Sequence, residues 1–213
     1  MAMVDELDSV VSYVAEVLSG AVDGDWSVPA GDLEWSCAFT VEHVGQALLH
    51  WSTQLAVNAE TGYVRWRSQV QNGAPPAGMI DFLEAAGRIL GLVVQAAPAG
   101  TRAFHPWGIA DPDGFAGMGC VELLLHGKDL ADGLALRYEP SAEVCLRVLT
   151  RMFAHRSDEL ADLGADSWTA LQWVTGRVDL PGRPSVQPWK WRATPLDEVW
   201  NPTPEPAPMR FMV

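Results

Sequence analysis

Apolar residues recur at spacings of three and four over most of the chain, which is the pattern of amphipathic α-helices. In residues 3–20 the apolar stripe consists of Val4, Leu7, Val10, Val11, Val14, Val17 and Leu18. With Thr40 as the N-cap of the next helix, further helices are predicted over about 41–60, 79–97, 117–134 and 141–163. Because alternating strand patterns are almost absent, the chain is predicted to be all-α, a four-helix bundle with an extra helix.

The pattern changes beyond residue 165. Residues 166–177 predict one more short helix, and the chain then becomes rich in Pro and Trp. The stretch "WKWRA", residues 189–193, predicts a short strand, and the remainder predicts extended packing or a loose tail. We therefore expect a helix bundle over residues 1–165 and a short C-terminal extension over residues 166–213.

Composition and charge narrow the class of protein. The chain has 213 residues, of which 48% are hydrophobic, enough for a sizeable core. Its 27 acidic and 14 basic residues give a net charge of −13, without a run of Lys or Arg, which argues against nucleic-acid binding. The start "MAMVDELDSV" lacks the apolar segment of a secretory signal, and no apolar run approaches the roughly 20 residues of a membrane span. We expect a cytoplasmic monomer or homodimer without a membrane partner.

The cysteines do not suggest a chemical role. Cys37, Cys120 and Cys145 are scattered and odd in number, without CxxC spacing, so neither a disulfide scaffold nor a cysteine zinc site is expected. Cys120 lies on the side of its predicted helix opposite to Glu122, and we expect it in the core.

The leucine-rich stretch "GMGCVELLLHGKDLADGL", residues 117–134, carries a polar line. At about 100° per residue, Glu122, His126 and Asp129 fall within roughly 60° of one another. Burying a carboxylate among leucines is costly unless it is paired or bound to a cation. Glu122 and His126 could form a surface pair worth a few tenths of a kcal/mol, or supply two ligands of a metal site. Asp129 could orient a ligand or be a solvated acid.

The second predicted helix offers a third ligand. His43 and His50 lie on one face of it, about 10 Å apart along the axis, too far to share an ion. If the second and fourth helices are parallel, His43 lies at the same end of the bundle as Glu122 and His126. These three are the predicted metal ligands. His50 is expected to be a satisfied core histidine or a polar group deeper in a pocket.

Two loops lead into these helices and carry aromatic residues. Trp35 precedes the second helix, while His105 and Trp107 precede the fourth. In the parallel arrangement both loops would rim the open side of the metal and shape a substrate pocket; otherwise the tryptophans only cap the end of the bundle. Arg151 and Arg156, on the last long helix, are expected to be surface cations rather than substrate clamps.

Two stretches resemble a known family. The sequences "TVEHV" (residues 40–44), after a Trp-containing loop, and "MGCVELLLHGKDLA" (residues 118–131) resemble the DinB-like metal-binding superfamily. More closely, they resemble its branch containing the N-terminal domain of mycothiol-dependent maleylpyruvate isomerase. The resemblance covers roughly residues 5–160. One departure is Gly119, where isomerase-like members often carry Arg.

The resemblance implies a four-helix bundle that binds one divalent metal ion, often zinc, through His43, Glu122 and His126. The Asp of the family's H-x-x-D pattern matches Asp129. It also implies a low-molecular-weight thiol cosubstrate, most often mycothiol but in other members bacillithiol or glutathione. The implied activity is that of an S-transferase or isomerase, in which a metal-bound thiolate attacks a small electrophile.

Two other functions fit the same residues. The metal could activate water for hydrolysis, with Asp129 or His105 as the base. Alternatively, the protein could be a non-catalytic bundle that binds a metal or another ligand.

Overall fold

The chain folds into helices, as the apolar spacing predicts. The computed structural model describes residues 2–200 and 202, and no strand occurs in this part of the chain. The elements are α1 (Met3–Ser19), α2 (Cys37–Ala56), α3 (Pro76–Ala96), α4 (Pro112–Gly133), α5 (Ala142–Met152), a 3₁₀ turn (Ala154–Arg156), α6 (Ser157–Ala161) and α7 (Ser167–Val174). The all-α prediction is therefore confirmed.

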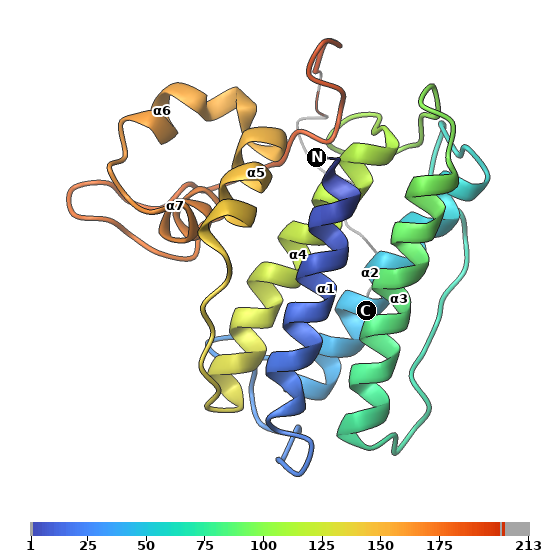
Figure 1. The fold of residues 1–213 in the computed structure, drawn as a ribbon, viewed down its shortest axis with the longest axis vertical. Coiled ribbons are helices and arrows are strands. Elements are labelled where there is room, and N and C mark those ends of the chain that lie inside the picture. Colours follow the sequence, from blue (N-terminus) through green and yellow to red (C-terminus); the bar gives the residue numbers. More distant parts are fainter. Residues whose placement is uncertain (1, 201, 203–213) are drawn as a thin grey trace.

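The four long helices α1 to α4 form a bundle in which α2 and α4 are antiparallel (Figure 1). A Cβ atom on Gly133, near the end of α4, would lie 2.8 Å from the sulfur of Cys37, the first residue of α2. The segment 57–75 runs back along the bundle, so that α3 starts at the same end as α2 (Figure 1). The expected parallel arrangement of the second and fourth helices is therefore wrong.

The core of the bundle follows the predicted stripe on α1, in which every apolar position except Val17 is buried. At the centre, a Cβ atom on Gly119 would lie 2.9 Å from Leu7 and about as close to Leu48 and Leu90. A larger side chain would force these helices apart, so the glycine permits close packing of α4 against its three neighbours. No helix among the described residues has the length and apolar composition of a membrane span.

Helices α2 and α4 begin four to five residues earlier than predicted because their caps differ. The N-cap of α2 is Ser36, whose hydroxyl accepts the N–H of Phe39, while Thr40 lies inside the helix and donates to the Ser36 carbonyl. Helix α4 begins at Pro112 rather than at 117. Asp111 accepts the N–H of Gly114, and proline suits the first helical position. Functional residues of α4 therefore lie near its middle.

The predicted helix over 141–163 is interrupted after Met152. The carbonyl of Met152 accepts the N–H of Arg192 from the C-terminal extension. This carbonyl is thereby satisfied from outside the helix, and the chain continues as the 3₁₀ turn and the short α6.

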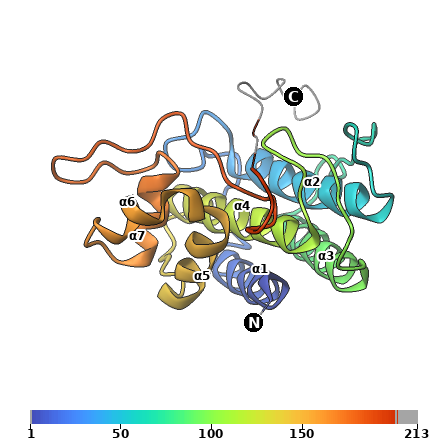
Figure 2. The ribbon, with the colours of Figure 1, turned by 90° about the horizontal axis from the view of Figure 1, so that it is seen from above.

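The C-terminal extension packs on the bundle. Helix α7 confirms the predicted short helix and contacts α5, and the segment that follows crosses above α4 (Figure 2). Residues 189–193 form no strand; Trp189 and Trp191 instead pack with Trp107. Most of the predicted loose tail, residues 201 and 203–213, lies outside the described residues. The boundary at residue 165 stays a prediction.

Candidate metal centre

Helices α2 and α4 bring together the three predicted metal ligands. His43 comes from the second turn of α2, and Glu122 and His126 come from successive turns of α4. The Glu122 Oε2 atom lies 3.3 Å from His126 Nε2 and 4.0 Å from His43 Nε2. One ligand atom of each residue lies within 4.8 Å of the others, so the group could hold a metal ion.

Burial excludes the surface-pair interpretation of Glu122 and His126. The exposed fractions of the side chains are 11% for His43, 15% for Glu122 and 13% for His126. His50 is not part of the group; it is partly buried against the ring of Tyr63 at a centroid distance of 4.8 Å.

Asp129 is hydrogen-bonded to His126. Its Oδ2 atom lies 2.9 Å from His126 Nδ1, and its Oδ1 atom pairs with Arg177, which follows α7. The carboxylate favours a proton on Nδ1, which directs Nε2 towards Glu122. Asp129 is 7% exposed, so the interpretation as a solvated acid is wrong.

The electrostatics of the group favour a positive charge between the carboxylate and the imidazoles. Burial opposes protonation of His126, but the hydrogen bond to Asp129 and the nearby carboxylate of Glu122 raise its pKa to about 9. Burial acts to raise the pKa of Glu122, yet His126, His43 and Arg177 together hold it below its usual value. Burial lowers the pKa of His43, which favours the neutral, ligating imidazole.

Two buried atoms of the group lack hydrogen bonds. Glu122 Oε2 and His43 Nδ1 have no hydrogen-bond partner among the described residues. Buried polar atoms are normally satisfied, and an unsatisfied carboxylate oxygen is especially costly. A divalent cation would satisfy Glu122 and use nitrogen and oxygen donors of the kind that zinc prefers. The residues therefore fit a metal ion.

The two loops that were expected to flank one opening lie at opposite ends of the bundle, because α2 and α4 are antiparallel (Figure 1). Trp35 contacts the group, with its ring centroid 4.7 Å from that of His43 and 6.3 Å from that of His126. His105 is only 4% exposed, and its Nδ1 accepts the N–H of Trp107. Burial lowers the pKa of His105 to about 3.

The expectation that Arg151 is exposed at the surface is wrong. It is 9% exposed rather than a surface cation, and it pairs with Asp111 and Asp113 at the start of α4. It also donates to the carbonyl groups of Arg192, Ala193 and Thr194. Arg156 pairs with Glu159 within its own segment.

Arg177 was not among the predicted site residues. It lies three residues after the end of α7 and far from Asp129 along the chain, and no spacing rule connects the two. The only available signal is indirect: a buried Asp129 requires a cationic or hydrogen-bonding partner.

Comparison with protein-family models, curated proteins and solved structures finds no match to this chain. The chemistry of the site is therefore the basis for assigning a function.

Proposed function

We propose that His43, Glu122 and His126 bind one divalent metal ion, zinc, in a DinB-like bundle. We further propose that the protein is a thiol-dependent S-transferase or isomerase that uses mycothiol to attack a small electrophile. The observation that supports this most strongly is the buried group of three ligand-type side chains in which Glu122 Oε2, which lies 3.3 Å from His126 Nε2 and 4.0 Å from His43 Nε2, forms no hydrogen bond.

The ligand set resembles that of catalytic zinc sites, in which two imidazoles and one carboxylate leave a position for an exogenous ligand. When bound, a divalent ion can keep a coordinated thiol deprotonated at neutral pH. The protein's own residues prepare the site: His43 is held neutral by burial, Asp129 orients His126, and Trp35 packs beside both imidazoles.

The cysteines of the chain support an external thiol. Cys37, Cys120 and Cys145 are free and buried. Burial raises the pKa of Cys37 to about 11 and that of Cys145 to about 12, and it also raises the pKa of Cys120. A thiolate nucleophile would therefore come from a cosubstrate rather than from the protein.

The hydrolase alternative has weaker support because neither predicted base is free. Asp129 uses one oxygen for His126 and the other for Arg177. His105 is buried, and its Nδ1 accepts the Trp107 N–H. Both residues have structural partners that compete with a role in proton transfer.

The test is the absorption spectrum of cobalt-substituted protein, titrated with mycothiol, bacillithiol and glutathione. We expect a sulfur-to-metal charge-transfer band and release of a proton with mycothiol. Both should be absent in Glu122→Ala and retained in His50→Ala. If none of the three thiols changed the spectrum, the thiol-transfer function would be wrong, and turnover of esters or amides without thiol would favour the hydrolase.

A further inference from the structure

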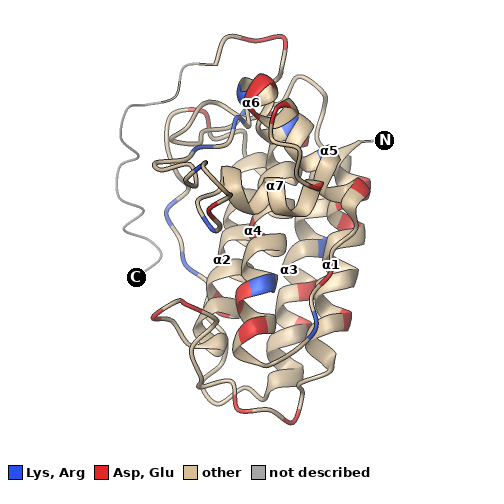
Figure 3. Cartoon of the chain, turned by 90° about the vertical axis from the view of Figure 1, so that its left-hand side faces the viewer, with Lys and Arg blue, Asp and Glu red and all other residues tan. Residues whose placement is uncertain are grey.

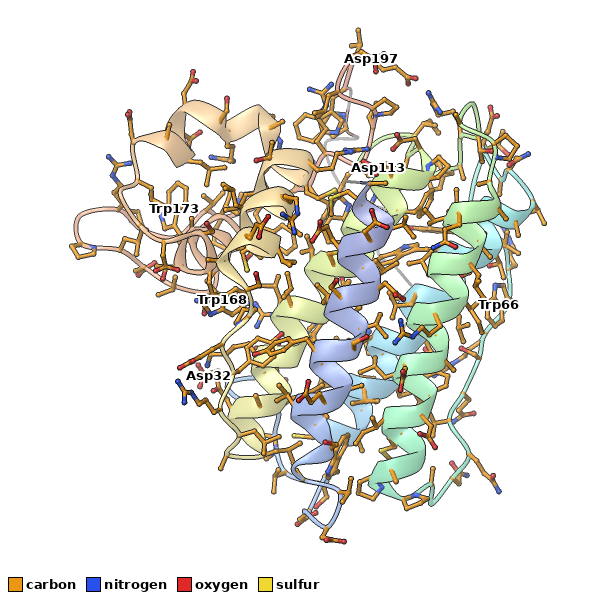
Figure 4. All side chains as sticks on the ribbon, in the orientation of Figure 1. Asp32, Trp66, Asp113, Trp168, Trp173 and Asp197 are labelled. Carbon is orange, nitrogen blue, oxygen red and sulfur yellow. The ribbon has the colours of Figure 1, made fainter. Side chains whose placement is uncertain are left out.

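The C-terminal extension reaches the metal centre through one side chain. Arg177 pairs with the Oδ1 atom of Asp129, and the Oδ2 atom of the same carboxylate lies 2.9 Å from His126 Nδ1. His126 Nε2 in turn lies 3.3 Å from Glu122 Oε2. Figure 3 faces the side of the molecule that carries α7, and Figure 4 labels Trp168 in the first turn of this helix. Arg177, Asp129, His126 and Glu122 therefore form a continuous polar row, which starts outside the helix bundle and ends at two of the three candidate metal ligands.

The backbone turn after α7 fixes the position of Arg177. The N–H of Arg177 donates to the carbonyl of Gln172 at 2.8 Å, and the N–H of Gly176 donates to that of Trp173 at 3.1 Å. These two bonds end a helix through a residue in the left-handed region, and the φ of Gly176 is +76°. A Cβ atom on Gly176 would clash with the amide nitrogen of Gln187, so the turn requires glycine. The folded backbone of the extension therefore determines where the Arg177 side chain begins.

The carboxylate of Asp129 needs a cationic partner. Its side chain is only 10% exposed, and a buried carboxylate oxygen without a partner is costly. The adjacent Lys128 pairs with Asp132, so the cation beside Asp129 is Arg177. Without Arg177, we expect the carboxylate to turn towards water or to take up a proton. Either change would release the Nδ1 atom of His126, and the imidazole would lose its fixed orientation.

We propose that Arg177 is a positioning residue of the metal centre, so that the docked C-terminal extension forms part of the metal site. This inference rests on the metal binding of the proposed function and not on its thiol chemistry. Removing a partner that holds the second nitrogen of an imidazole ligand lowers metal affinity about 10- to 100-fold. Because coupling between two binding events is reciprocal, the bound ion should also stabilise the docked extension.

The experiment measures the affinity of the full chain for Zn²⁺ by competition with a metal indicator. Arg177→Met removes the charge but keeps an unbranched side chain, and Arg177→Lys restores a positive charge. Arg183→Met is the matched control, because Arg183 is an exposed arginine of the same extension. Urea unfolding of the chelator-treated proteins measures separately how much each substitution changes the stability of the metal-free fold.

We expect Arg177→Met to weaken Zn²⁺ binding by at least about tenfold. Arg177→Lys should recover part of this loss, because lysine can pair with Asp129 only as a point charge, and Arg183→Met should bind as tightly as the wild type. Hydrogen exchange in α7 should become slower when Zn²⁺ binds to the wild type, and this effect should be smaller in Arg177→Met. A purely structural role would instead lower the stability of the metal-free protein without changing its affinity for Zn²⁺.

Equal Zn²⁺ affinity of Arg177→Met and Arg183→Met would overturn the proposal and would leave the metal site and the proposed function standing. Absence of Zn²⁺ binding in the wild type would contradict the metal site and, with it, the role of Arg177. Weakened binding in Arg177→Met without any cobalt–thiol band would support the role of Arg177 and contradict only the thiol chemistry.

Discussion

Helix α4 carries two clusters of buried polar side chains, and they differ in how completely they are paired. At its first turn, Arg151 donates to two carboxylates and three backbone carbonyls. Near its middle, Glu122 and His43 each keep a buried atom without a hydrogen-bond partner. The first cluster is complete within the protein and fastens the extension to the bundle. The second is incomplete at Glu122 Oε2, and a bound cation, as proposed above, would satisfy that oxygen.

The largest expected effect is on the complete cluster. Arg151→Leu would leave Asp111 and the three carbonyls without their donor, and we expect the free energy of unfolding to fall by about 3 kcal/mol. Urea unfolding measures this. Arg156→Leu, which breaks only a local pair with Glu159, should change stability by less than about 0.5 kcal/mol. Equal effects of the two variants would show that the Arg151 cluster is not a structural clamp.

Chelation tests the incomplete cluster. An ion bound only by the folded state stabilises it by about 2.7 kcal/mol at a free concentration of 100 times Kd. We expect chelator to lower the melting temperature while circular dichroism shows the helices retained, since the apolar faces of α1 to α4 supply the core. Complete loss of helicity would indicate a structural metal instead.

The contact between Asp129 and His126 predicts an effect of intermediate size on metal affinity. Asp129→Asn removes the charge that holds Nδ1 and pairs with Arg177, and we expect metal affinity to fall about 10- to 100-fold. Competition with a metal indicator measures this affinity. Asp132→Asn, one turn further along α4 and paired with Lys128, is the control and should keep the wild-type affinity. Unchanged affinity in Asp129→Asn would remove Asp129 from the site.

The smallest expected effect concerns pH. Folding lowers the pKa of His105 from about 6.5 to about 3, so below pH 6.5 the unfolded state binds a proton that the folded state excludes. Stability should therefore decrease between pH 6.5 and 5, by about 1–2 kcal/mol from this residue. In His105→Asn, whose side-chain oxygen can accept the Trp107 N–H, the decrease should be smaller by that amount. Urea unfolding of both proteins between pH 6.5 and 5 measures this difference. Identical slopes of stability against pH would contradict the low pKa assigned to His105.

Residue spacing within the predicted helices was sufficient to predict the three metal-ligand candidates. The i,i+4 pair of Glu122 and His126 and the position of His43 near the start of the second helix identified the group that the structure assembles. The predicted parallel arrangement of the second and fourth helices was nevertheless wrong, because α2 and α4 are antiparallel. The group forms in the antiparallel bundle because α4 begins at Pro112, which places Glu122 near the helix centre.

Local sequence patterns could not predict hydrogen-bond and ion-pair partners that are distant along the chain. Nothing near Arg177 in the chain indicates Asp129, and nothing near Arg151 indicates the carbonyls of residues 192–194. The cap of α2 was also misplaced, since Ser36 and Thr40 are both good capping residues and only the contacts of the preceding loop select Ser36.

The measurement that tests the account most directly is the metal content of purified variants, determined by elemental analysis. We predict close to one divalent ion per chain in the wild type and in His50→Ala. We predict almost none in His43→Ala, Glu122→Ala and His126→Ala, with the helical circular dichroism of all four variants unchanged. Full metal content in His43→Ala would contradict the central claim, because the ion would then be held without the histidine that α2 contributes.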